Sequence, residues 1–583
     1  MTEGPLDSRR EEHKSPQMTP PDDLRAANIK IALALSGGGY RAAAFHLGTL
    51  AYLQHIKLLP NLDRLSTVSG GTFTGAKYIL SLVENCPFPA FFNDFCTFLN
   101  KTNLIERGLK DLNQKSRKGL SGGRKLITSL ANVYACTFLA DSNHRPYTFG
   151  QILDADNIGV TEISFNATEF RTGVAFRFQK TFSQSAKIGN GNVFIEREDA
   201  KKIRLADIVA ASSCFPGGFE PLAFPQDFKW PDQNVLERVT ESMAISPEQQ
   251  PKYSCGTGEE SEAPVLKDTV ALMDGGIYDN QGIDSLLLAD NRENDGIPDL
   301  IIISDTDPTD ENVFPYPKKT LPSGWLTLKH VNWLIYGFLI TCFITVVSLA
   351  FGIWSEITQG TFGIWKDFFS ALMPLLLSAL VTGTILYGRG QIRKLLKQVP
   401  NLGIKSWQEL KTLKVNQFIY IMSLRVTSLS ALIRQVFMKR IRSLVFEQVY
   451  HDPTYNKARI TNRIDRLLTR PIDNVPHIGV LENRLRTVIN SAACMPTTLW
   501  FDADNVITIK TATGNKHINE LDSLVIAGQA TICFNLLQYI TRVYGKAPQS
   551  YPEKIHGLWQ DLQRDWQDLN ANPCVLLESL KQL

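Results

Sequence analysis

Three short segments of this sequence carry the residues that could do chemistry. Ser69 follows an apolar run and precedes the pair Gly70-Gly71. Upstream, the glycines Gly37–Gly39 also follow an apolar run, and far downstream Asp274 ends a third one. A hydroxyl, a row of backbone amides and a carboxylate are the minimum set for an enzyme that hydrolyses esters through an acyl-enzyme intermediate.

Ser69 is the candidate nucleophile. An ester hydrolase presents its serine on a tight turn between a strand and a helix, where the neighbouring residues must be small. Gly70 and Gly71 meet this requirement after the serine. Two residues before it, Thr67 stands where the G-x-S-x-G pattern has glycine. Taken alone, Ser69 is more typical of a turn serine, so the hypothesis depends on the other two segments.

The segment Gly37–Gly39 is the candidate donor of hydrogen bonds to an oxyanion. Successive glycines can present their amides without a Cβ in the way, and the helix expected after them adds the positive end of its dipole. Arg41 lies in the first turn of that helix. Its side chain would either hold the glycine loop or face a lipid phosphate.

Asp274 is the candidate general base. No histidine suits the role, because His46 and His55 belong to the expected first helix and the others lack a motif context. A carboxylate beside the serine can replace histidine if partial desolvation raises its pKa. Asp274 follows the apolar run Val270–Met273, which places it at the carboxyl end of a strand, where α/β active sites collect. Alone, it would be an ordinary turn aspartate.

The elements that must position these groups alternate between strands and helices. Apolar patterning predicts strands over 28–35 and 62–69, each followed by a helix, over 41–59 and 72–83. Two such units in succession indicate an α/β fold with a parallel sheet. Further strands are expected near 160–165, 173–178 and 300–304. The polar stretch Pro225–Pro264 is interpreted as a surface excursion that could act as a lid.

A dinucleotide-binding oxidoreductase is an alternative. Gly37-x-Gly39-x-x-Ala42 fits the dinucleotide fingerprint, and Asp63 follows at about the expected distance. In that fold the acidic residue closes the second strand, whereas Asp63 opens it. We keep this reading as the weaker alternative.

Two uncharged runs indicate a membrane hairpin. Val331–Trp354 has 24 residues and Phe368–Gly388 has 21, and about 20 suffice to cross a bilayer. Lysines and arginines flank the pair, whereas the linker Ser355–Asp367 holds only Lys366, so both ends are expected in the cytoplasm. The basic segment Val436–Tyr450 could lie on the inner leaflet or pack on the catalytic domain.

Composition narrows the remaining classes. A net charge of +3 over 583 residues gives no reason to expect a nucleic-acid partner. The nine cysteines include no CxxC pair, so neither a disulfide framework nor a zinc site is suggested. We expect no metal and no cofactor. Residues 1–27 are polar and lack the apolar core of a secretory signal, so we expect a disordered lead.

Together these segments resemble the patatin-like phospholipase family. Gly37–Arg41 is similar to its glycine-rich oxyanion motif, Ser69 to its nucleophile and Asp274-Gly275-Gly276 to its catalytic aspartate motif. Ala211–Gly217 is similar to the family's stretch between nucleophile and aspartate. The resemblance covers about Asn28–Thr309. Residues 495–539 resemble, more weakly, the C-terminal part of membrane-associated bacterial members.

The resemblance implies a three-layer α/β/α hydrolase with a mainly parallel sheet, into which the membrane hairpin is inserted. It implies a Ser69–Asp274 dyad in which Asp274 takes the serine proton, and an oxyanion hole made by the amides of Gly37, Gly38, Gly39 and Gly70. Arg41, Gly71, Gly275 and Gly276 would support the site. The implied activity is that of a phospholipase A or lysophospholipase acting on membrane lipid, without metal or cofactor. A catalytically silent membrane scaffold with the same fold is the alternative.

The expected domain organisation has five parts. A disordered lead (1–27) precedes a catalytic domain (28–310) and a linker (311–330). A two-helix transmembrane hairpin (331–388) follows, and then a mostly helical cytoplasmic region (389–583) that packs on the catalytic domain. The protein would thus be a multi-pass membrane protein with its catalytic domain on the cytoplasmic side, and its protein partners stay unknown.

Overall fold

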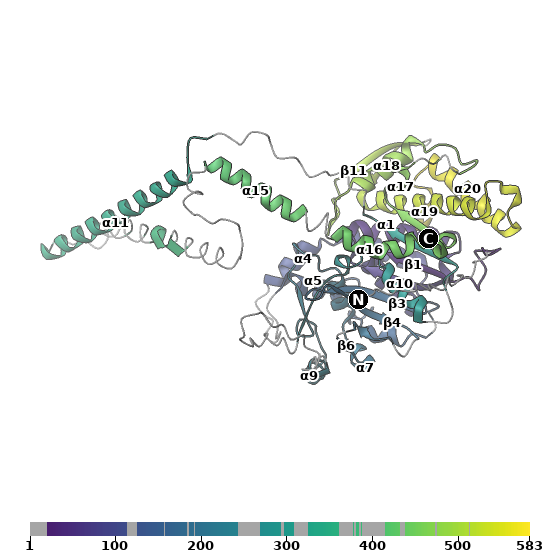
Figure 1. Ribbon diagram of the computed structural model, residues 1–583, viewed down its shortest axis with the longest axis horizontal. Helices are drawn as coiled ribbons and strands as arrows, with labels where there is room; N and C mark the ends of the chain where they lie inside the picture. The colour runs from purple at the N-terminus through teal and green to yellow at the C-terminus, as the bar shows by residue number, and fades with distance from the viewer. Residues whose placement is uncertain are drawn as a thin grey trace, which may run out of the picture. The chain divides into compact units, whose positions relative to one another are not determined.

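The computed structural model describes most of the chain in two compact units (Figure 1). One unit comprises Met1–Glu311 and Met438–Leu583, and the other Asn312–Phe437. The described residues are 20–113, 125–156, 158–182, 186–191, 193–242, 269–292, 297–307, 324–360, 373, 377, 380–383, 386–387, 414–431, 438–470, 472, 475–511 and 514–582.

The first unit is built on a ten-stranded sheet whose central strands are parallel. In spatial order these are β10 (Arg459–Arg463), β9 (Leu300–Asp305), β1 (Ile31–Leu35), β2 (Leu62–Val68) and β3 (Glu162–Glu169). Antiparallel strands continue the sheet beyond β3: β4 (Val174–Lys180), β5 (Ile188–Gly189) and β6 (Phe194–Ile195), with β7 (Leu222–Phe224) and β8 (Val270–Asp274) on a branch. The expected α/β fold with a mainly parallel central sheet is confirmed.

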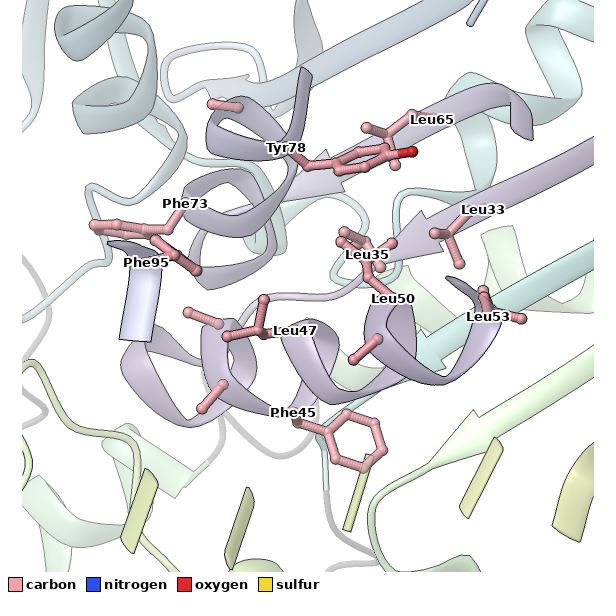
Figure 2. Packing of buried hydrophobic residues seen from close by; sticks show 14 of the residues in the cluster. Leu33, Leu35, Phe45, Leu47, Leu50, Leu53, Leu65, Phe73, Tyr78 and Phe95 are labelled. Carbon is pink, nitrogen blue, oxygen red and sulfur yellow. The ribbon is translucent and has the colours of Figure 1, made fainter. Parts of the chain in front are cut away.

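Helices cover both faces of this sheet. Along β1, Ile31, Leu33 and Leu35 enter the large core cluster, whereas Ala32 and Ala34 enter a smaller one on the opposite face, as the period of two in a strand requires. Figure 2 shows Leu33 and Leu35 packed among side chains of α1 (Gly39–His55) and α2 (Gly70–Val83). The smaller cluster is closed by α10 (Ile283–Arg292) and α16 (Met438–Tyr450).

The segments Asn28–Leu35 and Leu62–Ser69 form strands and the segments after them form helices, as expected. Residues 243–264 of the expected surface excursion lie outside the described residues; the described part before them includes α9 (Gln233–Ser242). Only Pro20–Ala27 of the expected disordered lead is described. There Leu24 is fully buried and Arg25 donates to the Ile56 carbonyl at 2.9 Å, so the packed chain begins before Asn28 and the expectation was wrong for this stretch.

The C-terminal segment adds a long core helix, α19 (Glu520–Tyr544), that crosses α1 closely. A Cβ on Gly48 would lie 2.1 Å from the Val525 carbonyl oxygen, and one on Gly528 would lie 2.2 Å from that of Phe45. Only glycine permits this approach of two backbones. The helix is long and apolar enough to span a membrane, but 94% of its most apolar window is buried, as in the core of a globular domain.

The second unit contains the other helix of that length and apolarity. In α11 (Leu328–Thr358), the stretch Trp333–Thr358 has a mean hydropathy of 2.3, and only 6% of its most apolar window is buried. Two described helices are thus long and apolar enough to cross a membrane, and α11 is the one whose apolar side chains are exposed. The second expected span, Phe368–Gly388, lies mostly outside the described residues. The unit also includes α15 (Val415–Ala431).

The basic segment Val436–Tyr450 corresponds to α16, which belongs to the first unit. Val449 is buried in the smaller core cluster, and Phe446 and Tyr450 pack against it. Of the two interpretations drawn from the sequence, packing against the catalytic domain is the one that the structure favours.

Candidate active site

The positions of Ser69 and Asp274 follow from the way two strands share one edge of β3. Strand β2 pairs in parallel with the first part of β3, up to Val68 opposite Asn166. Strand β8 pairs antiparallel with the last part, beginning with Asp274 opposite Ala167. The two strands therefore run towards each other along the same edge, and their carboxyl ends meet. Ser69 and Asp274 lie at this junction.

Ser69 occupies a strained turn between β2 and α2. Its φ of 50° and ψ of −117° are rare for a residue with a side chain. The following glycines are required by close packing. A Cβ on Gly70 would lie 2.2 Å from the Gly39 carbonyl oxygen, and one on Gly71 would lie 2.3 Å from that of Leu35. The serine is thus held at the start of a helix, on a turn of the kind that exposes a nucleophile.

Thr67 is accommodated without a glycine. It is the penultimate residue of β2, is fully buried, and does not have a positive φ. Its methyl group lies where the facing helix has Gly75: a Cβ on that glycine would come within 2.5 Å of Thr67 Cγ2. The Thr67 hydroxyl lies 3.0 Å from that of Thr72. Gly75 on the facing helix therefore provides the space that a smaller residue at position 67 would otherwise have to provide.

Asp274 is buried beside the serine. Burial raises its pKa to about 6, against the lowering effects of a hydrogen bond from the Ser69 hydroxyl, one from the Gly276 amide and the charge of Arg442. The Gly276 amide donates to Asp274 Oδ1 at 2.7 Å. At neutral pH about nine in ten of such carboxylates are ionised, so the group can accept a proton and is basic enough to hold it.

The glycine loop presents some of its amides and uses another internally. The Gly37 amide donates to the Asn280 carbonyl at 3.0 Å, so it is not free for an oxyanion. Gly38 and Gly39 have φ values of 141° and 61°, which favour glycine. Within the described part of the chain, the amides of Gly38, Gly39 and Gly70 have no hydrogen-bond acceptor. These free donors stand at the starts of α1 and α2, where both helix dipoles are positive.

Arg41 holds a loop of the C-terminal segment rather than facing solvent. The residue is only 5% exposed, and its Nη1 donates to the Met495 carbonyl at 2.9 Å. The neighbouring Tyr40 amide donates to the Thr498 carbonyl at 2.8 Å. Of the two roles considered for Arg41, holding the polypeptide around the glycine loop is the one that its contacts support.

The segment Ala211–Gly217 forms hydrogen bonds with both Ser69 and Asp274. Ser212 ends α8 (Leu205–Ser212), and its hydroxyl accepts the Ser69 amide at 3.0 Å while it donates to the Asn166 carbonyl at 2.7 Å. The Cys214 carbonyl accepts the Asp274 amide at 2.9 Å. Gly275 packs so closely on β3 that a Cβ would lie 2.4 Å from the Asn166 carbonyl oxygen.

Arg442 is the functional residue that sequence reasoning missed. From α16, its Nε donates to the Gly276 carbonyl at 2.8 Å and its Nη1 to Asp307 at 3.1 Å. Asp307 also accepts from the Asn280 side chain at 2.9 Å. Arg442 therefore supports the aspartate turn and lowers the pKa of Asp274. No local motif marks it, because it lies 168 positions beyond Asp274 in a segment that read as basic and amphipathic.

Two other candidates from the sequence have structural roles. Asp63 lies at the amino end of β2, the end opposite the glycine loop, and accepts a hydrogen bond from the Thr161 hydroxyl at 2.8 Å. This position does not suit the ribose contact of a dinucleotide fold. His46 is buried with both ring nitrogens engaged, 2.9 Å from the Ser36 carbonyl and 2.9 Å from the Ser304 hydroxyl. Burial lowers the pKa of His46 to about 4.

Comparison with known proteins supports the patatin-like α/β fold. Residues 33–287 match the family model described as Patatin-like phospholipase. This segment of the chain is therefore similar to patatin-like phospholipases, and the similarity suggests a lipid acyl hydrolase at the level of the family. The matched segment includes the glycine loop, Ser69 and Asp274.

Solved structures of human GIVD cytosolic phospholipase A2 resemble part of the chain. One is 14% identical, covers 47% of this chain and 42% of that one, and has a TM-score of 0.30. A complex of that enzyme with methyl gamma-linolenyl fluorophosphonate and terbium chloride is 14% identical, covers 47% of this chain and 40% of that one, and has a TM-score of 0.26. The chain thus spans less than half the length of these structures. No curated protein matches the sequence.

Proposed function

We propose that this protein is a serine acyl hydrolase of membrane lipids, of the phospholipase A or lysophospholipase type. One observation carries the proposal: Ser69 sits on a strained strand-to-helix turn with its hydroxyl hydrogen-bonded to the buried carboxylate of Asp274. A serine that served only to form a turn would need neither strained backbone dihedral angles nor a buried carboxylate beside it. Strain held at such a position is typical of a functional site.

The proposed reaction has two halves. Ser69 Oγ attacks the acyl carbonyl carbon while its proton passes to Asp274, and the oxyanion accepts hydrogen bonds from the free amides of Gly38, Gly39 and Gly70. The ester C–O bond then breaks, and the leaving alcohol takes the proton from Asp274. In the second half, water attacks the acyl-enzyme and gives its proton to Asp274. The fatty acid leaves as Ser69 Oγ regains that proton.

The proposed oxyanion hole uses three amides rather than the four expected, because a hydrogen bond within the protein engages the fourth. Gly37 was expected to contribute an amide, but that amide is bonded to Asn280. We assign Gly37 the role of bringing the loop close to the nucleophile, because a Cβ on it would lie 3.1 Å from Ser69 Cβ and 2.5 Å from Asn280 Oδ1. Gly71, Gly275 and Gly276 shape the two turns, and Arg41 holds the neighbouring loop.

Anchoring in a bilayer is the second part of the proposal. The exposed apolar surface of α11 supports a membrane helix, with Phe368–Gly388 as the returning span and the catalytic domain on the cytoplasmic side. The substrate would then be a phospholipid or lysophospholipid of the adjacent leaflet. We keep the five-part division of the chain as part of this proposal, with the packed part of the catalytic region extended back to Pro20.

Labelling with a fluorophosphonate ester in native membranes tests the dyad, since this reagent reacts with an activated serine. We expect labelling of the wild type and none of Ser69→Ala or Asp274→Ala. Ser81→Ala is a matched control, because Ser81 is also buried and lies in α2, the helix that Ser69 immediately precedes. An unlabelled wild-type protein that is folded and membrane-bound would refute the enzyme and favour the silent scaffold. Hydrolysis assays with phosphatidylcholine and its lysophospholipid then separate the two activities.

A further inference from the structure

A polar cavity lies in the same unit as the candidate active site, along the outer strand of the sheet. It encloses about 700 Å³ between α16, β10, α17 (Arg466–Thr469) and α19. Asp305 and Arg463, which are paired in register as the last residues of β9 and β10, both line it. The cavity therefore reaches the carboxyl ends of the parallel strands, the edge at which α/β sheets bind their ligands.

Arginines dominate the lining of this cavity. Four carboxylates also line it, those of Asp305, Asp307, Asp465 and Glu447. The arginines outnumber them by two: Arg442, Arg459, Arg463, Arg466, Arg470 and Arg542.

Most of these arginines lack a carboxylate partner. Arg442 pairs with Asp307 at 3.1 Å, and Arg463 pairs with Asp465 at 3.0 Å. In the part of the chain that the structure describes, the other four form no ion pair. Arg459 and Arg542 are held instead by backbone carbonyls and by the rings of Tyr450 and Tyr539, respectively.

Like charges in the cavity oppose one another. Burial and the nearby Arg459 lower the pKa of Arg542, and burial and the nearby Arg470 lower that of Arg466. Unpaired, partly desolvated guanidinium groups are unfavourable unless an anion neutralises them. Guanidinium groups bind phosphate oxygens in pairs of parallel hydrogen bonds, which suits them to this ligand.

Protection of an edge strand explains only part of the cluster. Charged side chains on an outer strand discourage pairing with other chains, and Arg459 and Arg463 are the first and last residues of β10, on the same face of the strand. Protection of the strand does not account for Arg466, Arg470 and Arg542. These residues lie outside β10 and line the same cavity.

We propose that this cavity binds a phosphate monoester group, whose two negative charges match the excess of two arginines. The group comes either from a soluble phosphorylated metabolite or from a lipid with a terminal phosphate. The inference is independent of the dyad, because binding requires no hydrolysis.

Calorimetric titration of the full-length protein tests the proposal. We would use the Ser69→Ala variant in phosphatidylcholine nanodiscs, so that lipid is not consumed. One arm titrates glycerol 3-phosphate. The other titrates dihexanoyl phosphatidic acid below its micelle concentration, with dihexanoyl phosphatidylglycerol as the singly charged comparison. Binding in the first arm alone identifies a soluble source, and binding in the second alone identifies a lipid; either supports the site.

Two variants test whether the ligand binds in this cavity. The Arg470 side chain is exposed and makes no hydrogen bond within the described residues, so Arg470→Gln should not disturb folding. Arg542 is also exposed, and Arg542→Gln removes a side chain that donates to the Arg459 carbonyl. Each should raise Kd about tenfold or more, the loss expected for one charge-assisted hydrogen bond. Arg484→Gln, outside the cavity, should leave Kd unchanged. The proposal fails if neither ligand binds, if phosphatidylglycerol binds equally well, or if both cavity variants retain the wild-type Kd.

Discussion

Replacing Asp274 by asparagine should inactivate the enzyme and stabilise the fold at alkaline pH. Burial raises the pKa of Asp274 from 3.8 to about 6. A shift of about two units corresponds to about 3 kcal/mol. Because the pKa in the folded state exceeds that in the unfolded state, the protonated form favours folding. This contribution is complete below about pH 4 and is lost as the pH rises through 6.

The asparagine variant avoids that loss because it cannot ionise. Its Oδ1 can still accept the Gly276 amide, and its Nδ2 can donate to Ser69 Oγ. At pH 8 the variant should therefore be more stable than the wild type by up to about 3 kcal/mol, which raises Tm by about 3 °C in a unit of this size. At pH 4 the difference should largely vanish. Removing the base should also lower kcat/KM by a factor of about 10³ or more.

Two measurements check these expectations. Thermal unfolding in detergent would compare wild type and Asp274→Asn from pH 4 to pH 8, with Asp504→Asn as the control, since Asp504 is exposed. The wild-type pH–rate profile of kcat/KM should rise with pH and reach half its plateau near pH 6. A variant that is less stable than the wild type at pH 8, or one that keeps its activity, would refute a buried general base at this position.

Three further substitutions probe the support of the site. Gly70→Ala places a Cβ 2.2 Å from the Gly39 carbonyl oxygen and should slow fluorophosphonate labelling about 100-fold, by displacing an oxyanion donor. Arg442→Gln removes a cation that lowers the pKa of the base, so the midpoint of the pH–rate profile should move to higher pH. Gly75→Ala should cost about 1–3 kcal/mol, measured by thermal unfolding, because its Cβ meets Thr67 Cγ2 at 2.5 Å.

Each of these substitutions has a matched control. Gly557→Ala adds a Cβ with no atom within 4 Å, in the helix α20 (Glu553–Ala571), and should leave labelling unchanged. Arg484→Gln removes an arginine remote from the site and should leave the midpoint in place. Thr67→Ser deletes the methyl group but keeps the hydroxyl. Combined with Gly75→Ala in one protein, it should therefore restore most of the stability that Gly75→Ala alone loses. Equal effects in a variant and its control would contradict the corresponding assignment.

The sequence predicts Ser69 and Asp274 as the reacting groups because the patterns that mark them are local. The glycine after Ser69 and the apolar run before Asp274 each indicate the carboxyl end of a strand. Active sites of α/β proteins lie at these strand ends. The meeting of the two residues was not deducible, because it depends on β8 sharing an edge of β3 with β2 in the opposite direction. The use of the Gly37 amide was equally hidden, since its acceptor is Asn280, 243 residues away.

Length and apolarity do not distinguish a membrane-spanning helix from a core helix, because both α11 and α19 meet these criteria. The polar residues of the two helices do distinguish them. Helix α19 carries Asn535, which is 4% exposed and whose side-chain amide donates to Asn462 at 3.0 Å. Such residues are expensive in hydrocarbon and are placed where a packed core gives them partners. The described apolar stretch of α11 instead presents Phe343, Val347 and Phe351 on its surface, where they are 69%, 51% and 73% exposed.

Thr67 shows which part of the nucleophile motif is a physical requirement. A glycine two residues before the serine is needed if the backbone must take a positive φ there or if the facing helix leaves no room. Neither applies, because Thr67 lacks a positive φ and Gly75 supplies the space. The positive φ falls on Ser69 itself, and the close backbone contacts fall on Gly70 and Gly71. The departure from the motif at Thr67 therefore gives no support to a silent scaffold.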